Sequence, residues 1–99
     1  MTDKERQESA NLILSFLDET CGAYDWDDFI SPSSKDPDFE LLRVYCASTN
    51  YLYPPTDPKC WCSDLGSEKL RILSELLIST SQFKVISDFI CSEQQKYLK

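Results

Sequence analysis

Residues 10–22 read ANLILSFLDETCG, and this stretch decides the fold. The apolar residues that share one face at helical spacing are Ala10, Ile13, Leu14, Leu17 and Cys21. Leu12 and Phe16 widen that face, and Gly22 is typical of a helix stop. The pattern therefore predicts an amphipathic helix from about Lys4 to Thr20.

A second helix start follows at Asp36-Pro37. Asp36 is suited to cap the helix and Pro37 to occupy its first turn. The helix should run to about Ala47. Pro54, Pro55 and Pro58 then forbid a helix, so residues 48–62 are expected to form one long ordered Pro-rich loop packed on the body.

Two more apolar repeats complete the chain. Leu70, Leu73 and Leu77 predict a third helix that begins at Ser63 or Ser67. The next repeat extends from Phe83 to Tyr97. The interval between them, residues 79–82, contains neither Gly nor Pro, so the last two helices are either separate or one kinked helix.

Composition favours the same class of fold. The chain has 99 residues and only two glycines, which argues against a turn-rich β protein. We expect a single all-α domain over residues 1–99, a small compact bundle of four helices. The N-terminus carries charges of both signs and no apolar run is long enough for a membrane span. With five cysteines, an odd number, we expect free thiols in the cytoplasm.

The acidity of the chain is concentrated near its beginning. Residues 1–34 carry eight acidic and two basic residues, whereas residues 35–99 carry nine and eight. In residues 24–29, YDWDDF, three carboxylates lie among three aromatic rings. Aromatic anchors surrounded by uncompensated negative charge favour a basic protein partner. The net charge of −7 disfavours nucleic acid and membrane surfaces, which would repel it.

The residues predicted to contact that partner are Tyr24, Asp25, Trp26, Asp27 and Asp28, joined by Asp18 and Glu19 from the end of the first helix. In the structural alternative, Trp26 and Phe29 plug the bundle instead. Arg43 could then pair with Asp27 or Asp28, which would make the segment partly a latch.

Catalytic and metal-binding functions find less support. The chain has no histidine and no Gly-rich phosphate loop, so we expect neither an enzyme nor a cofactor. Cys60 and Cys62 could supply half of a zinc site, completed by Cys46 and either Cys21 or Cys91. In the more ordinary interpretation, one cysteine of the pair points inward, the other points outward, and Trp61 covers the core.

A wider pattern joins these segments. Trp26-Asp27-Asp28-Phe29 is followed by residues 36–43, DPDFELLR, and by Tyr53-Pro54-Pro55. Over residues 24–77 this resembles an uncharacterised family of small bacterial proteins with a Trp-Asp-Asp-Phe segment, an Asp-Pro-x-x-Glu-x-x-Arg segment and a Pro-Pro loop. The resemblance implies a shared fold but no activity and no site.

These observations favour a non-enzymatic binding protein, most concretely an immunity protein or inhibitor that neutralises a basic toxin or nuclease. Two alternatives remain open. One is a DNA-mimic inhibitor of a nucleic-acid enzyme, of the kind that phages encode, and the other is a small zinc-stabilised adaptor.

Overall fold

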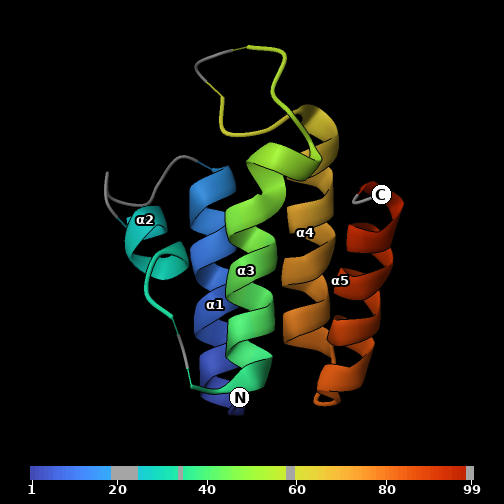
Figure 1. The fold of residues 1–99 in the computed structure, drawn as a ribbon. Coiled ribbons are helices and arrows are strands. Elements are labelled where there is room, and N and C mark those ends of the chain that lie inside the picture. Colours follow the sequence, from blue (N-terminus) through green and yellow to red (C-terminus); the bar gives the residue numbers. More distant parts are fainter. Residues whose placement is uncertain (19–24, 34, 58–59, 98–99) are drawn as a thin grey trace.

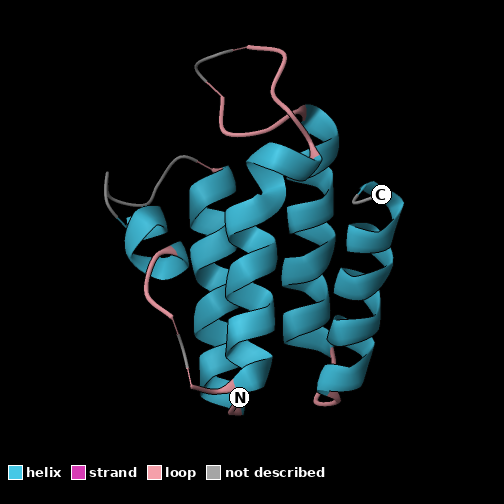
Figure 2. Cartoon of the chain, viewed as in Figure 1, coloured by secondary structure: helices cyan, strands magenta, loops and turns pink. Residues whose placement is uncertain are grey.

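The computed structural model describes residues 1–18, 25–33, 35–57 and 60–97. Five helices make up the fold: α1 (Asp3–Leu17), α2 (Asp25–Ile30), α3 (Pro37–Leu52), α4 (Asp64–Ser79) and α5 (Phe83–Tyr97) (Figure 1). The described residues contain no strand, as Figure 2 shows. The all-α prediction is therefore confirmed, with one helix more than the four expected.

The four long helices run roughly along one common direction, with α3 in front of α1, and the short helix α2 lies at the outer side of α1 (Figure 1). The α1 helix packs along α4, and α3 packs along α5. No Cα atom of α1 comes within 8 Å of one in α3, but α2 packs on both. The radius of gyration is 12.7 Å, close to the value of about 13 Å for a compact chain of this length.

Side-chain caps fix where the long helices begin. Thr2 and Glu5 form a reciprocal capping box at the start of α1. The Asp36 carboxylate accepts a hydrogen bond from the backbone N–H of Asp38 at 2.9 Å, as predicted for a cap at this position. Ser63 caps α4, which selects the earlier of the two starts that the sequence offered.

The sequence pattern predicted no helix between Thr20 and Asp36, but the structure places α2 there. Trp26, Phe29 and Ile30 are spaced so that their side chains share one face of a helical turn, and burial of that face stabilises the short helix. The α3 helix also runs five residues past Ala47, to Leu52. It ends at Tyr53 because the residue before a proline disfavours helical geometry.

The α4 and α5 helices are separate, although no Gly or Pro stands between them. A tertiary contact explains the break. Arg6 of α1 is buried, and its guanidinium donates hydrogen bonds to the carbonyl oxygens of Leu77 and Thr80. A cation at the negative end of α4 satisfies carbonyls that the helix leaves unpaired.

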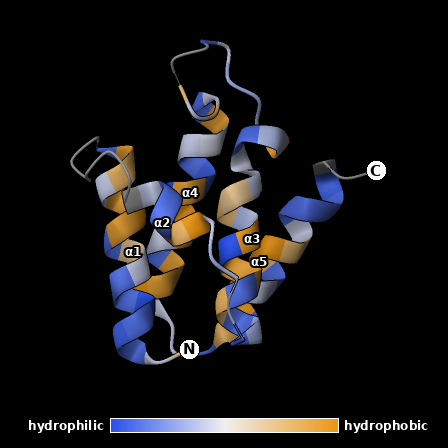
Figure 3. Ribbon diagram, turned by 60° about the vertical axis from the view of Figure 1, so that its left-hand side comes forward, coloured by the Kyte–Doolittle hydropathy of each residue, from blue (hydrophilic) through white to orange (hydrophobic). Residues whose placement is uncertain are grey.

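The core lies between the long helices. Its fully buried side chains come from all four: Ala10, Ile13, Leu42, Tyr45, Cys46, Leu70, Leu73, Leu77, Ile86 and Ile90. The N-terminal turns of α1 are mainly hydrophilic and its C-terminal half is mainly hydrophobic (Figure 3). The half-buried side chains of Phe16 and Phe29 pack against this core from the side where α2 lies.

None of the described helices combines the length and the apolar character needed to cross a membrane.

Candidate partner-binding surface

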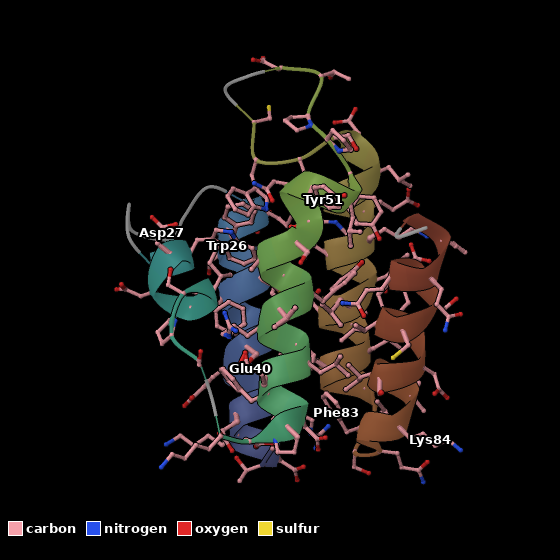
Figure 4. The ribbon with its side chains drawn as sticks, in the orientation of Figure 1. Trp26, Asp27, Glu40, Tyr51, Phe83 and Lys84 are labelled. Atoms are coloured by element: carbon pink, nitrogen blue, oxygen red, sulfur yellow. The ribbon has the colours of Figure 1, made fainter. Side chains whose placement is uncertain are left out.

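Trp26 lies inside the protein. Its ring stacks on Phe16 of α1 with centroids 3.9 Å apart and planes 12° apart, and it meets Trp61 edge-on at 6.3 Å. Only 5% of the residue is exposed, and in Figure 4 its side chain points from α2 towards α1. The expectation that Trp26 is a surface anchor for a partner is therefore wrong for this conformation. The structural alternative, in which Trp26 plugs the bundle, describes it.

The indole N–H of Trp26 has no hydrogen-bond partner in the part of the chain that the structure describes. Trp61 differs, because its indole N–H donates to the Thr49 hydroxyl at 2.7 Å. An unpaired buried donor has a free-energy cost of about 1–3 kcal/mol. The stacked rings around Trp26 must offset that cost.

The carboxylates next to Trp26 face the solvent. Asp27 and Asp28 are exposed on α2, and Asp27 points away from the body of the protein (Figure 4). Asp18 is exposed at the C-cap of α1. No ion pair joins any of these three to another described residue.

The carboxylate of Asp18 lies at an electrostatically unfavourable position. A carboxylate at a helix C-terminus lies beside the negative end of the helix dipole, and neither α1 nor α2 has a basic residue in its last turn. Of the other predicted contact residues, Glu19 and Tyr24 lie outside the described residues. Asp25 begins α2, but its side chain is not described.

Arg43 forms a latch, but not with the predicted aspartates. Its guanidinium donates to the backbone carbonyl of Ile30 at 2.6 Å and also pairs with Glu40, one turn away on α3. No ion pair with Asp27 or Asp28 is present among the described residues. Arg43 therefore ties the last residue of α2 to α3 and leaves both aspartates available to solvent.

A hollow of about 620 Å³ opens beside α2. Leu12 of α1, Phe29 of α2 and Phe39 of α3 line it with apolar surface, and the Phe29 and Phe39 rings meet edge-on at 5.9 Å. A second hollow of about 250 Å³ is lined by the same three residues and reaches Glu5 and Glu8 on α1. We refer to the two together as the α1–α2 groove.

The length of α2 explains the groove. Six helical residues extend about 9 Å, whereas the fifteen of α1 extend about 22 Å. The short helix covers the C-terminal part of α1 through the stack of Trp26 on Phe16, and leaves Leu12 only half-buried. Sequence reasoning did not predict this groove. Its signal was the position of Leu12 beside, and not within, the main apolar stripe.

Charge surrounds the apolar lining of the α1–α2 groove. Glu5, Glu8 and Asp28 contribute carboxylates, and Lys35 contributes one ammonium group. The Thr2 backbone N–H donates a hydrogen bond to the Glu5 carboxylate at 2.9 Å, which lowers the pKa of Glu5 from its usual value. Glu8 lies 3.9 Å from Lys4, a contact between two exposed groups that contributes little energy.

The described cysteines of the proposed zinc site are not brought together, and Cys21 lies outside the described residues. Cys46 is fully buried in α3, where burial raises the pKa of its thiol well above the usual range, while Cys60 is exposed. Among the described residues, no group of three or more Cys, Asp or Glu side chains could hold a metal ion. The interpretation with Cys62 inward, Cys60 outward and Trp61 against the core is confirmed.

Glu93 of α5 is a buried carboxylate that the sequence analysis did not identify. It is 3% exposed, and it accepts hydrogen bonds from the Tyr53 hydroxyl at 3.0 Å and from Lys96 at 3.1 Å. Lys69 of α4 lies 3.1 Å from it, and the Tyr45 and Tyr53 hydroxyls are 2.8 Å apart. Burial raises the pKa of Glu93, but these partners outweigh burial and lower it overall. The group ties α3, α4 and α5 together.

Comparison with protein-family models, curated proteins and solved structures finds no match to this chain.

Proposed function

We propose that this chain is a non-enzymatic binding protein for a basic protein partner, most concretely an immunity protein or inhibitor that neutralises a basic toxin or nuclease. The observation that carries the proposal is that Asp18, Asp27 and Asp28 are exposed and form no ion pair with any other described residue. Exposed charge of one sign, with Asp28 in the lining of an apolar groove, is complementary to the basic cleft with which such a toxin holds nucleic acid.

The cost of these charges supports a role in binding. Asp18 lies at the unfavourable end of α1, and no basic residue in the last turn of that helix offsets it. Features that oppose folding without a structural gain are typical of functional surfaces. The absence of histidine removes the commonest general base, which also favours binding over catalysis. The odd number of cysteines favours a reducing compartment, and we propose the cytoplasm.

The test uses two charge-matched variants. One replaces Asp18, Asp27 and Asp28 by Asn. The other replaces Glu68, Glu75 and Asp88, which are exposed on α4 and α5, by their amides. The first partner to test is the product of the gene immediately upstream, followed by purified basic nuclease toxins of the same genome. Inhibition of the toxin and the association rate are measured at increasing salt.

We expect the unchanged protein to inhibit its toxin and to associate more slowly as salt rises. The Asp18, Asp27 and Asp28 variant should associate at least about tenfold more slowly at low salt, while the control variant should lose less than about threefold. Equal losses in the two variants would show that overall charge, and not this surface, guides binding. Failure to inhibit any of the basic toxins would contradict the proposal.

A further inference from the structure

The burial of Trp26 leaves the proposed surface with charge but without its expected aromatic anchor. The exposed large apolar side chains among the described residues do not replace it, because none of them lines the α1–α2 groove. Protein interfaces nevertheless need a desolvated apolar centre, since charged contacts at the rim contribute mainly to rate and specificity.

The α1–α2 groove offers that centre in concave form. Leu12, Phe29 and Phe39 come from three different helices and converge on it, and each is only half-buried. A hollow of about 620 Å³ can take one or two large side chains, within the range of about 300–1,000 Å³ for ligand pockets. An apolar side chain that enters it would contact two phenylalanine rings and a leucine.

The charges around the groove determine which residues can flank that side chain in the partner. Two of the carboxylates that line the groove are exposed, that of Asp28 on α2 in the larger hollow and that of Glu8 on α1 in the smaller one. Asp28 has no ion pair among the described residues. With Glu5, these carboxylates outnumber the one ammonium group of Lys35 in the lining by three to one. A Lys or Arg that flanks the entering apolar residue is therefore attracted on balance, and an acidic residue is repelled.

We infer that the α1–α2 groove is the receptor for a segment of the basic partner in which a large apolar side chain is flanked by Lys or Arg. The inference rests on the proposed function, but it changes which of the two proteins supplies the apolar anchor. The anchor of the complex is supplied by the partner, and this chain supplies the pocket.

The experiment uses a short synthetic peptide with a leucine pair flanked by lysines. One matched peptide has serines in place of the leucines, and another has glutamates in place of the lysines. Binding to the full chain is measured by calorimetry and by shifts of backbone amide resonances. We expect the leucine–lysine peptide to bind at least about tenfold more tightly than either matched peptide and to shift resonances around Leu12, Phe29 and Phe39.

A filling variant tests the location without removing charge or core. Ser33 is exposed and lines the groove, so Ser33→Trp should occupy it and weaken the leucine–lysine peptide by at least about tenfold. Ser31→Trp is the matched control, because Ser31 is also exposed in the same connection but lies outside the lining. Ser31→Trp should change affinity by less than about twofold. Far-UV circular dichroism establishes that both variants are folded.

The other outcomes overturn the inference in distinguishable ways. If both lysine peptides bind equally and Ser33→Trp has no effect, the acidic surface binds without the groove, and the proposed function stands. If the glutamate peptide binds as well as the lysine peptide, the groove does not select a basic segment. If no peptide binds, the groove is not a receptor, and the toxin experiment alone decides the proposed function.

Discussion

The side of the molecule where α5 packs on α3 and the side where α2 packs on α1 differ in how their polar groups are partnered. On the first side, Glu93 is buried but accepts bonds from Tyr53 and Lys96 and is paired with Lys69. On the second side, the Trp26 indole has no partner among the described residues, and no cation pairs with Asp27 or Asp28 there. The first side gains stability from its polar groups, while the second retains costs that binding would relieve.

The two sides also differ in how completely their helices pack together. The Tyr45 and Phe89 rings meet edge-on at 6.1 Å between α3 and α5, directly beside the Glu93 network. The α2 side is closed where Trp26 stacks on Phe16, and the α1–α2 groove remains open beside this stack. Because the Trp26–Phe16 stack holds α2 in place while the groove beside it is open, the α2 side can bind a partner without unfolding.

The largest expected effect breaks the stack that holds α2. Trp26→Ala should lower the free energy of unfolding by about 3–5 kcal/mol, because it removes a buried ring from between Phe16 and Trp61. Urea denaturation followed by far-UV circular dichroism measures the change. The control is Tyr51→Ala on α3, where the ring is 70% exposed and the loss should stay within about 0.5 kcal/mol. Similar small losses in both variants would mean that Trp26 is a surface residue after all.

The second effect concerns Glu93 and depends on pH. Glu93→Gln should cost about 2 kcal/mol at neutral pH, since it removes the charge that holds Lys69 and Lys96. The folded-state pKa of Glu93 is lowered from the ordinary value of 4.5, so its stabilising contribution is present above that value and is lost as the pH falls through the folded pKa. The difference in stability between the two proteins should therefore stay constant from pH 7 to about pH 5 and shrink below it.

Urea midpoints of both proteins across this pH range provide the measurement. Glu75→Gln, an exposed change on α4, is the matched control and should show little difference at any of these pH values. A Glu93→Gln difference that grows on acidification would mean that burial dominates and that the carboxyl is protonated in the fold.

The sequence predicted the local features of these two sides better than their tertiary contacts. Asp36-Pro37 predicted a helix start correctly, and Ser63 is one of the two starts predicted for the next helix, because capping depends on local chemistry. Glu93 was missed, although its spacing from Ile86 and Ile90 places it on their buried face. Its partners Tyr53 and Lys69 come from other parts of the chain, and their convergence depends on tertiary packing. The burial of Trp26 likewise depends on Phe16 and Trp61, which no local pattern places beside it.

A third test compares two ring-conserving changes directly. Tyr53→Phe removes a hydroxyl that is bonded to both Tyr45 and Glu93, so it should cost about 1–2 kcal/mol. Trp26→Phe removes an N–H without a described partner, so the lost ring area is partly offset and the cost should be about 1 kcal/mol or less. Denaturant midpoints of the two variants give the comparison. The opposite order would show that the Trp26 N–H is partnered in solution.

The smallest expected change in stability comes from neutralising the two exposed aspartates of α2, and the same variant tests whether this side binds a partner. Asp27→Asn with Asp28→Asn should change the free energy of unfolding by about 0.5 kcal/mol or less, because both residues are exposed and unpaired among the described residues. Arg43→Ala should cost more, about 1–2 kcal/mol, since it removes the hydrogen bond to the Ile30 carbonyl and the pair with Glu40. If Asp27 or Asp28 paired with Arg43, the aspartate variant and Arg43→Ala would lose the same stability. Equal denaturation midpoints for the two variants would therefore support such a pair.

If the aspartate variant keeps its midpoint but loses the salt dependence of its association with a basic toxin, the carboxylates are retained for binding and not for the fold.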